Sequence, residues 1–254
     1  MLMDGGLARI GRLLPGFHEL SEGVNSPVRG IAATDAGEVT VIAKKVSLRV
    51  LGIELACAVY GRAAGLPIPE PLVLLDDAGA LHFGSVDISH PSLAQFISLS
   101  DTSAHSHLVD WPGLLSAACF DELIVNPDRH EGNLLYDGQS FTLIDHDLCM
   151  PHGMVPTSAF TPDDANVLLK LAIDALPKDD LSKRRMLKDA NSWIASLEDH
   201  MVDSAEAAMD GVCTSAIQSQ LTSFLRLRLA KLSDLITDKV NPEQGRLSLA
   251  NDKS

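Results

Sequence analysis

The sequence predicts an α+β protein with a small β-rich part followed by a mainly helical part. Residues 20–90 are rich in β-branched runs and turn signals. Residues 162–239 instead place apolar residues at helical spacing among many charges. We therefore expect two lobes, a smaller one over residues 1–90 and a larger one over residues 91–239, followed by a frayed tail over residues 240–254.

The smaller lobe should contain at least three strands and one helix. Residues 38–46 follow a turn signal and are rich in β-branched residues, which indicates a strand. Residues 49–64 have the spacing of a helix that ends before Gly65, because glycine commonly follows the last helical residue. Residues 66–86 predict a proline-bounded entry, a strand, a turn at 76–79 and a second strand.

The larger lobe should begin with a helix over residues 112–125. A polar loop at 126–133 follows, and two short apolar runs joined by the turn DGQS predict a β-hairpin that ends near Asp145. Three or four helices should fill residues 162–239. This order predicts a cleft between a small sheet and a helical lobe, with the polar loop and Asp145 facing the cleft.

Composition limits the classes of partner. The 254 residues are 46% hydrophobic and have a formal net charge of −14, so the chain has little from which to build the basic face that a nucleic-acid or anionic-membrane partner needs. No run approaches 18 consecutive apolar residues. The four cysteines form no CxxC pair and the first residues do not resemble a signal peptide. We expect a cytoplasmic protein with reduced thiols, no nucleic-acid partner and no membrane span.

Three polar residues have the pattern of a phosphoryl-transfer site. Asp128 and Asn133 are five positions apart on the polar loop, and Asp145 ends the apolar run after the hairpin. One carboxylate can orient an attacking hydroxyl, while an amide oxygen and a second carboxylate can hold Mg²⁺. Singly, each residue could equally be a turn or cap residue. Their joint spacing and the hairpin between them favour the catalytic interpretation.

A phosphate-binding cation is expected on the strand at 38–46. Lys44 and Lys45 point to opposite faces of the strand, so only one of them can enter the cleft. The run VIAK is close to V-A-I-K and favours Lys44, whereas the spacing Ala43-x-Lys45 favours Lys45. Glu54, inside an apolar helix, is the expected ion-pair partner.

A phosphate-covering loop is expected at residues 21–30, just before the lysine strand. It contains Gly23 and Ser26, and the backbone N–H groups of such a turn can hold phosphate. The segment matches neither GxGxxG nor the P-loop pattern, so an ordinary hairpin turn is the competing interpretation.

These motifs resemble those of HipA-like kinases and of the phosphoinositide-kinase-like branch of the protein kinase superfamily. The most specific parts are DRHEGN at 128–133 and LIDHD at 143–147. The segments at 53–75 and 83–93 resemble the helix–turn–strand and the following hinge of HipA-like domains. The resemblance covers about residues 20–150 and implies a two-lobed protein-kinase-like fold that binds ATP and Mg²⁺.

The resemblance also implies roles for individual residues. Asp128 would be the catalytic residue, and Asn133 and Asp145 would be the metal ligands. Lys44, or Lys45 in the other register, would contact the ATP phosphates, with Glu54 as its partner.

Further roles implied by the resemblance concern the base and the acceptor. Residues 83–86, including Gly84 and Ser85, would offer backbone hydrogen bonds to adenine. HipA-like toxins phosphorylate proteins on Ser or Thr and can autophosphorylate a serine of the phosphate loop, whose place Ser26 occupies here. The chain is shorter than those toxins, so a minimal toxin, a small-molecule kinase and a domain that awaits a partner or antitoxin-like chain are all compatible with it.

Two other classes of function compete with a protein Ser/Thr or lipid kinase. His130, His146 and His152 lie near three aspartates in the sequence, which is compatible with a metal-dependent phosphoester hydrolase. That alternative leaves the lysine strand, Glu54 and Asn133 without roles. A catalytically silent nucleotide-binding scaffold would keep the same residues without chemistry.

Overall fold

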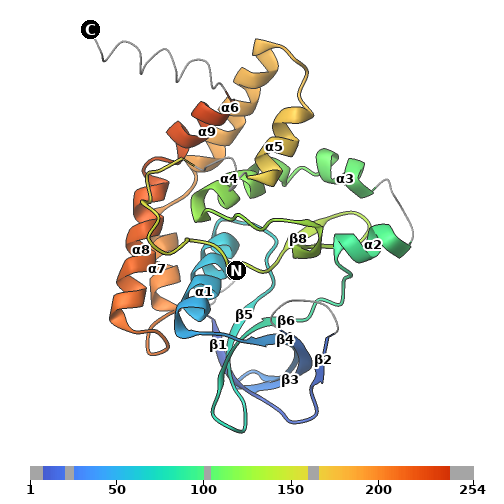
Figure 1. Cartoon of the computed structure of the whole chain (residues 1–254), viewed down its shortest axis with the longest axis vertical. Helices are drawn as coiled ribbons and strands as arrows, with labels where there is room; N and C mark the ends of the chain where they lie inside the picture. The colour runs from blue at the N-terminus through green and yellow to red at the C-terminus, as the bar shows by residue number, and fades with distance from the viewer. Residues whose placement is uncertain (1–7, 21–25, 100–103, 160–165, 241–254) are drawn as a thin grey trace.

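Strands from the first third of the chain form one six-stranded sheet, and helices with one two-stranded sheet form most of the rest (Figure 1). The computed structural model describes residues 8–20, 26–99, 104–159 and 166–240. Across these ranges, no helix combines the length and the apolar character needed to cross a membrane. The expected tail and Gly23 lie outside the described residues.

The sheet closes into a five-stranded barrel. Its strands are β1 (Arg9–Leu13), β2 (His18–Glu19), β3 (Val28–Thr34), β4 (Gly37–Lys45), β5 (Pro71–Leu75) and β6 (Leu81–Val86). Strand β1 pairs with β5 in parallel and with β3 antiparallel, which closes the order β1-β5-β6-β4-β3 into a ring, while β2 extends β3. Leu13, Val28, Val41, Ala43, Leu72 and Leu74 are buried together in one apolar cluster of these strands.

Strand β4 confirms the strand expected at 38–46, and β5 and β6 confirm the pair expected within 66–86. Strand β1 was not expected from the sequence. Its five residues include two arginines and a glycine, and Ile10 is 63% exposed, so it lacks the apolar alternation of a half-buried strand. Its partner residues lie 19 or more positions away in the sequence, and local pattern does not reveal such pairing.

Helix α1 (Leu48–Ala63) lies between the sheet and the helical part. It begins after Ser47, whose hydroxyl accepts the Val50 N–H at 3.3 Å, and it is followed by Gly65 at φ +80°. All residues from Leu51 to Gly61 are buried, because α1 contacts β5 and β6 on one side and α7 and α8 on the other. The helix expected at 49–64 is therefore confirmed.

The remaining elements surround α4 (Leu114–Ile124), which is buried along most of its length. They are α2 (Leu93–Leu99), α3 (Ala104–Asp110), the 3₁₀ turn η1 (Glu131–Asn133), β7 (Leu134–Tyr136), β8 (Phe141–Leu143), α5 (Val167–Asp174), α6 (Asp180–Ile194), α7 (Asp199–Ala207), α8 (Ser215–Leu229) and α9 (Leu232–Val240). The expected hairpin is β7–β8. Within 166–240 there are five helices rather than three or four, since α8 and α9 are separate helices with only two residues between them.

Gly61 of α1 has no side chain where Ile68, and Phe120 of α4, pack against the helix. A Cβ there would lie 2.4 Å from Ile68 Cδ1 and 3.0 Å from Phe120 Cζ. We predict that Gly61→Val lowers the free energy of unfolding by about 1–3 kcal/mol through overpacking. Ala63→Val, at an exposed position of the same helix, should cost less than about 0.7 kcal/mol. Urea denaturation of both variants measures the difference, and equal losses would contradict this packing.

Candidate active site

Lys44 is the strand lysine that the fold brings to acidic side chains. Its ammonium contacts Glu54 Oε1 from α1 and lies 2.5 Å from Asp145 Oδ1 and 3.4 Å from Asp147 Oδ2. The Lys44 side chain is 12% exposed and that of Glu54 is fully buried. Lys45 is exposed at the end of the same strand. The consecutive elements β4 and α1 thus meet, at one cation, a segment that lies about 100 positions further along the chain.

The charges of this cluster stabilise one another. Burial alone would lower the pKa of Lys44, but the attraction of Glu54 and Asp145 reverses this effect and holds the pKa above its ordinary value. Burial alone would raise the pKa of Glu54, yet Lys44 and His146 lower it to about 2. The Lys44–Glu54 pair is therefore ionised at neutral pH.

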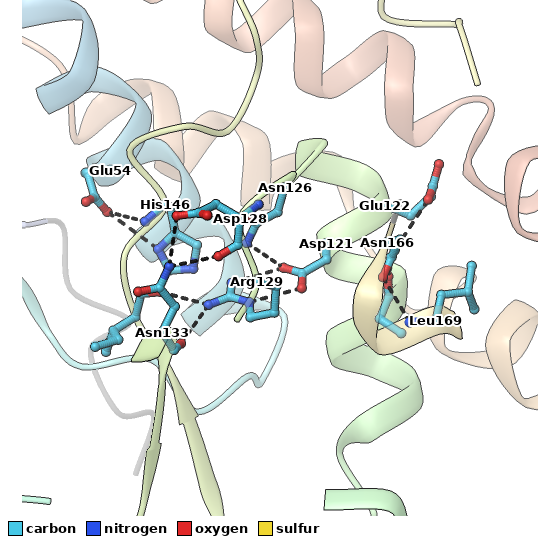
Figure 2. A network of polar contacts seen from close by, with 12 residues as sticks. Glu54, Asp121, Glu122, Asn126, Asp128, Arg129, Asn133, His146, Asn166 and Leu169 are labelled. Carbon is cyan, nitrogen blue, oxygen red and sulfur yellow. Dashed lines mark hydrogen bonds and ion pairs between the residues drawn. The ribbon is translucent and has the colours of Figure 1, made fainter. Parts of the chain in front are cut away.

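His146 and Asp147 belong to this cluster, although the kinase interpretation of the sequence gave a role to neither and His146 was considered only for the hydrolase alternative. The backbone N–H of His146 donates to Glu54 Oε2 at 3.1 Å (Figure 2). The buried His146 ring lies against Phe120. Burial, followed by repulsion from Asp145 and Glu54, holds the pKa of Asp147 above its ordinary value despite the attraction of Lys44. The run LIDHD contains both residues, but its pattern does not indicate which side chains turn inward.

Asp145 has a backbone conformation that is uncommon for a residue with a side chain. Its φ is +58°, in the left-handed region. Hydrogen bonds fix the residues on either side of Asp145. The carbonyl of Ile144 accepts a hydrogen bond from Arg129 Nη1 at 2.7 Å, and the backbone N–H of His146 donates to Glu54. This geometry directs the Asp145 carboxylate toward Lys44, and such strain is typical of functional sites.

Asp128 and Asn133 lie together on the loop between α4 and β7. Asn133 Nδ2 donates to the carbonyl oxygen of Asp128 at 2.8 Å and to its Oδ2 at 3.3 Å (Figure 2). The Asp128 side chain is 45% exposed, and its backbone N–H is held by Asn126 Oδ1 at 3.0 Å. The loop thus presents one solvent-accessible carboxylate and one amide whose nitrogen is already occupied.

Arg129 holds this loop in place and was not singled out from the sequence. Its buried guanidinium makes two 3.0 Å hydrogen bonds to the Asp121 carboxylate of α4. Nη1 donates to the carbonyls of Asn133, at 2.9 Å, and of Ile144 (Figure 2). A carboxylate inside the apolar run of α4 was the available signal, because a buried acid requires a partner.

The structure places the other expected residues as follows. Ser26 is exposed with φ +44°, next to residues that the structure does not describe. Gly84 and Ser85 lie inside β6, which is paired with β4 on one side and β5 on the other. Just beyond them, the N–H groups of Val86 and Asp87 are bonded to Glu70 O and Thr40 O, both at 2.9 Å.

The three histidines do not gather around a common point. His146 is buried against Glu54, whereas His130 and His152 are exposed, His130 at 3.7 Å from Asp128. In the part of the chain that the structure describes, no three His, Cys, Asp or Glu side chains are placed to hold a metal ion by themselves. The hydrolase alternative therefore gains no support from the described residues.

Of the comparisons with known proteins, only the one with solved structures finds a match. No protein-family model and no curated protein matches the chain. Among solved structures, it is similar to the crystal structure of a Helicobacter pylori proinflammatory kinase, CtkA, with a TM-score of 0.54 and 14% sequence identity over 92% of this chain and 97% of that chain. At this identity the likeness shows a kinase-like fold and does not single out the HipA-like branch.

Removing Arg129 should destabilise the protein strongly. We predict that Arg129→Leu lowers the free energy of unfolding by about 3–5 kcal/mol, because Asp121 would become an uncompensated buried charge. The double variant Asp121→Leu/Arg129→Leu should lose less. Arg12→Leu, which breaks an exposed ion pair with Asp77, should cost less than about 1 kcal/mol. Chemical denaturation tests all three, and a double variant no more stable than Arg129→Leu would contradict the argument.

Proposed function

We propose that this chain is an ATP- and Mg²⁺-dependent kinase that transfers the γ-phosphoryl group to a hydroxyl acceptor. The observation that supports it best is the contact of Lys44 with Glu54 and Asp145 within a kinase-like fold. A buried cation held by one carboxylate and facing a second, half-exposed one is suited to a phosphate and its counterion.

In this proposal Glu54 positions Lys44, which binds the phosphates of ATP. Glu54 is fully buried and has a lowered pKa, so it remains a fixed anion on a rigid helix. Lys44 would exchange its contact with Asp145 for a phosphate oxygen when the nucleotide binds. Lys45, which is exposed, has no role in this arrangement.

Asn133 and Asp145 would hold Mg²⁺. The nitrogen of the Asn133 amide donates to Asp128, which leaves its carbonyl oxygen as a ligand, and a carboxylate with an amide oxygen is a donor set that Mg²⁺ accepts. Two protein ligands suffice because the substrate phosphates and water complete the shell. The bound ion would neutralise charge on the transferring phosphoryl group.

Asp128 would act on the acceptor. Its carboxylate is half-exposed and is oriented by Asn133, so it can accept the proton of an incoming hydroxyl. The acceptor oxygen would then bond to the γ-phosphorus while the bond to the β–γ bridging oxygen breaks and ADP leaves. Positioning and electrostatics would supply most of the rate enhancement.

The adenine contacts would lie further along the chain than the sequence suggested. Gly84 and Ser85 are enclosed between two strands, and the N–H groups of Val86 and Asp87 already have partners. The Ser89 N–H is also bonded, to Asp87 Oδ1 at 2.7 Å, so the backbone of Ile88, which leaves the sheet after β6, is the better place for a base edge. Arg29 pairs with Asp87 at 2.6 Å and would border that position.

A protein Ser or Thr is the acceptor that we favour, with lipid headgroups and small molecules as alternatives. Autophosphorylation of Ser26 belongs to this proposal, since the residue is exposed and precedes β3. Cytoplasmic location and an antitoxin-like partner chain are likewise parts of the proposal that rest on the sequence resemblance alone.

The two lysines provide a matched test of nucleotide binding. We predict that Lys44→Met weakens Mg²⁺–ATP binding at least about tenfold, because a charge-assisted hydrogen bond to phosphate is lost. Lys45→Met should bind like the wild type. Calorimetric titration measures both affinities, with thermal melts to confirm folding. Equal affinities of the two folded variants would contradict the role of Lys44.

Variants of Asp128 and Asp145 distinguish the transfer step from the binding of the nucleotide. We expect Asp145→Asn to lose Mg²⁺-dependent ATP binding, and Asp128→Asn to retain binding while transfer slows by about 10²–10⁴-fold. Mass spectrometry measures transfer as the phosphoryl groups gained by the protein itself or by a mixture of substrate proteins. Binding without any transfer by the wild type would favour the silent scaffold, and absence of binding would overturn the proposal.

A further inference from the structure

A cavity whose lining contains no residue of the Lys44 cluster lies between the start of α1, the segment at 150–156 and α8. Its volume is about 290 Å³. The side chains and backbone that line it are mostly apolar and include Met150, Met154, Leu221, Phe224 and Leu227. Helices α1 and α8 run side by side here (Figure 1) and approach closely at Gly52, where a Cβ would lie 3.0 Å from Leu221 Cδ1. The cavity is therefore bordered by packed elements.

Arg49 is the one charged residue among those that line the cavity. Its guanidinium donates to Met150 O at 2.8 Å and to Gln220 Oε1 at 3.1 Å, and both acceptors are neutral. In the described ranges, no carboxylate lies within ion-pair distance of it. In contrast, Arg228, which lies on α8 like Gln220, forms an ion pair with Glu122 at 2.8 Å.

Arg49 has neutral acceptors although the chain as a whole is acidic. The chain has 34 acidic and 20 basic residues, so a partly buried arginine has many possible partners. Burial without a nearby anion lowers the pKa of Arg49, which agrees with the geometry. A partly desolvated guanidinium at the edge of an apolar cavity is a recognition element for a carboxylate.

We propose that this cavity binds a small amphipathic carboxylate, with its apolar body among Met150, Leu221 and Phe224 and its anionic group on Arg49. A cavity of 150 Å³ holds benzene, so 290 Å³ accommodates a body about twice that size. Apolar walls with one convergent polar group are the ordinary composition of a small-molecule site. The proposal does not depend on the kinase function, because it uses none of the residues of the Lys44 cluster.

The test compares two probes that differ in charge. We expect 4-phenylbutyrate to bind saturably in calorimetric titration without nucleotide, and 4-phenylbutan-1-ol to bind at least about tenfold more weakly. Arg49→Gln should reduce the affinity for the acid to that for the alcohol. Absence of binding by the acid, or equal affinity for acid and alcohol, would overturn the proposal.

A second pair of variants locates the site without removing Arg49. Ser223 is exposed and lines the cavity, so Ser223→Trp should fill it and abolish binding of 4-phenylbutyrate. Ser215→Trp, at an exposed position about two turns earlier on α8, should leave the affinity unchanged. Thermal melts show that both variants fold. Unchanged binding by folded Ser223→Trp would place the ligand elsewhere and overturn the assignment.

Discussion

The buried ion pair between Asp121 and Arg129 is the interaction on which the arrangement of the candidate site depends. Arg129 joins α4, the loop of Asp128 and Asn133, and the end of β8, through hydrogen bonds to one carboxylate and two backbone carbonyls. Burying a guanidinium is costly unless each donor finds a partner. These hydrogen bonds hold the loop of Asp128 and Asn133 beside Ile144, the residue before Asp145, and the Ile144 N–H also donates to Asn133 O at 3.2 Å. The requirement for satisfied charges therefore orders the site.

Glu122, the residue of α4 that follows Asp121, also holds other elements in place through buried ion pairs. Glu122 is fully buried and binds Arg228 of α8 and Lys239 of α9, both at 2.8 Å. Arg228 also donates to the carbonyls of Pro156 and Ser158. Successive helical residues point about 100° apart. Two adjacent carboxylates on one helix therefore hold the loop of Asp128 and Asn133 on one side and the carboxy-terminal helices on the other.

The Lys44 cluster connects these helices to the barrel. Lys44 comes from the sheet, Glu54 from α1 and Asp145 from the segment after β8, so the cation links all three layers. The left-handed backbone of Asp145 persists because the residues before and after it are both bonded to buried groups. In the proposed reaction, the same attraction that pairs Lys44 with Asp145 would be transferred to the nucleotide phosphates and the metal ion.

The sequence by itself determined that a β-rich part with one helix precedes a mainly helical part, and it gave the spacing of Asp128, Asn133 and Asp145, because hydrophobic periodicity and turn residues are local signals. It left Lys44 and Lys45 as alternatives, and it indicated neither β1 nor the position of Arg129. Those features depend on strand register, barrel closure and the pairing of buried charges between residues that are 8 to more than 100 positions apart. Only the tertiary structure decides these features. The free energy of burying a charge, or the polar backbone of a strand edge, depends on the partners that folding brings beside it.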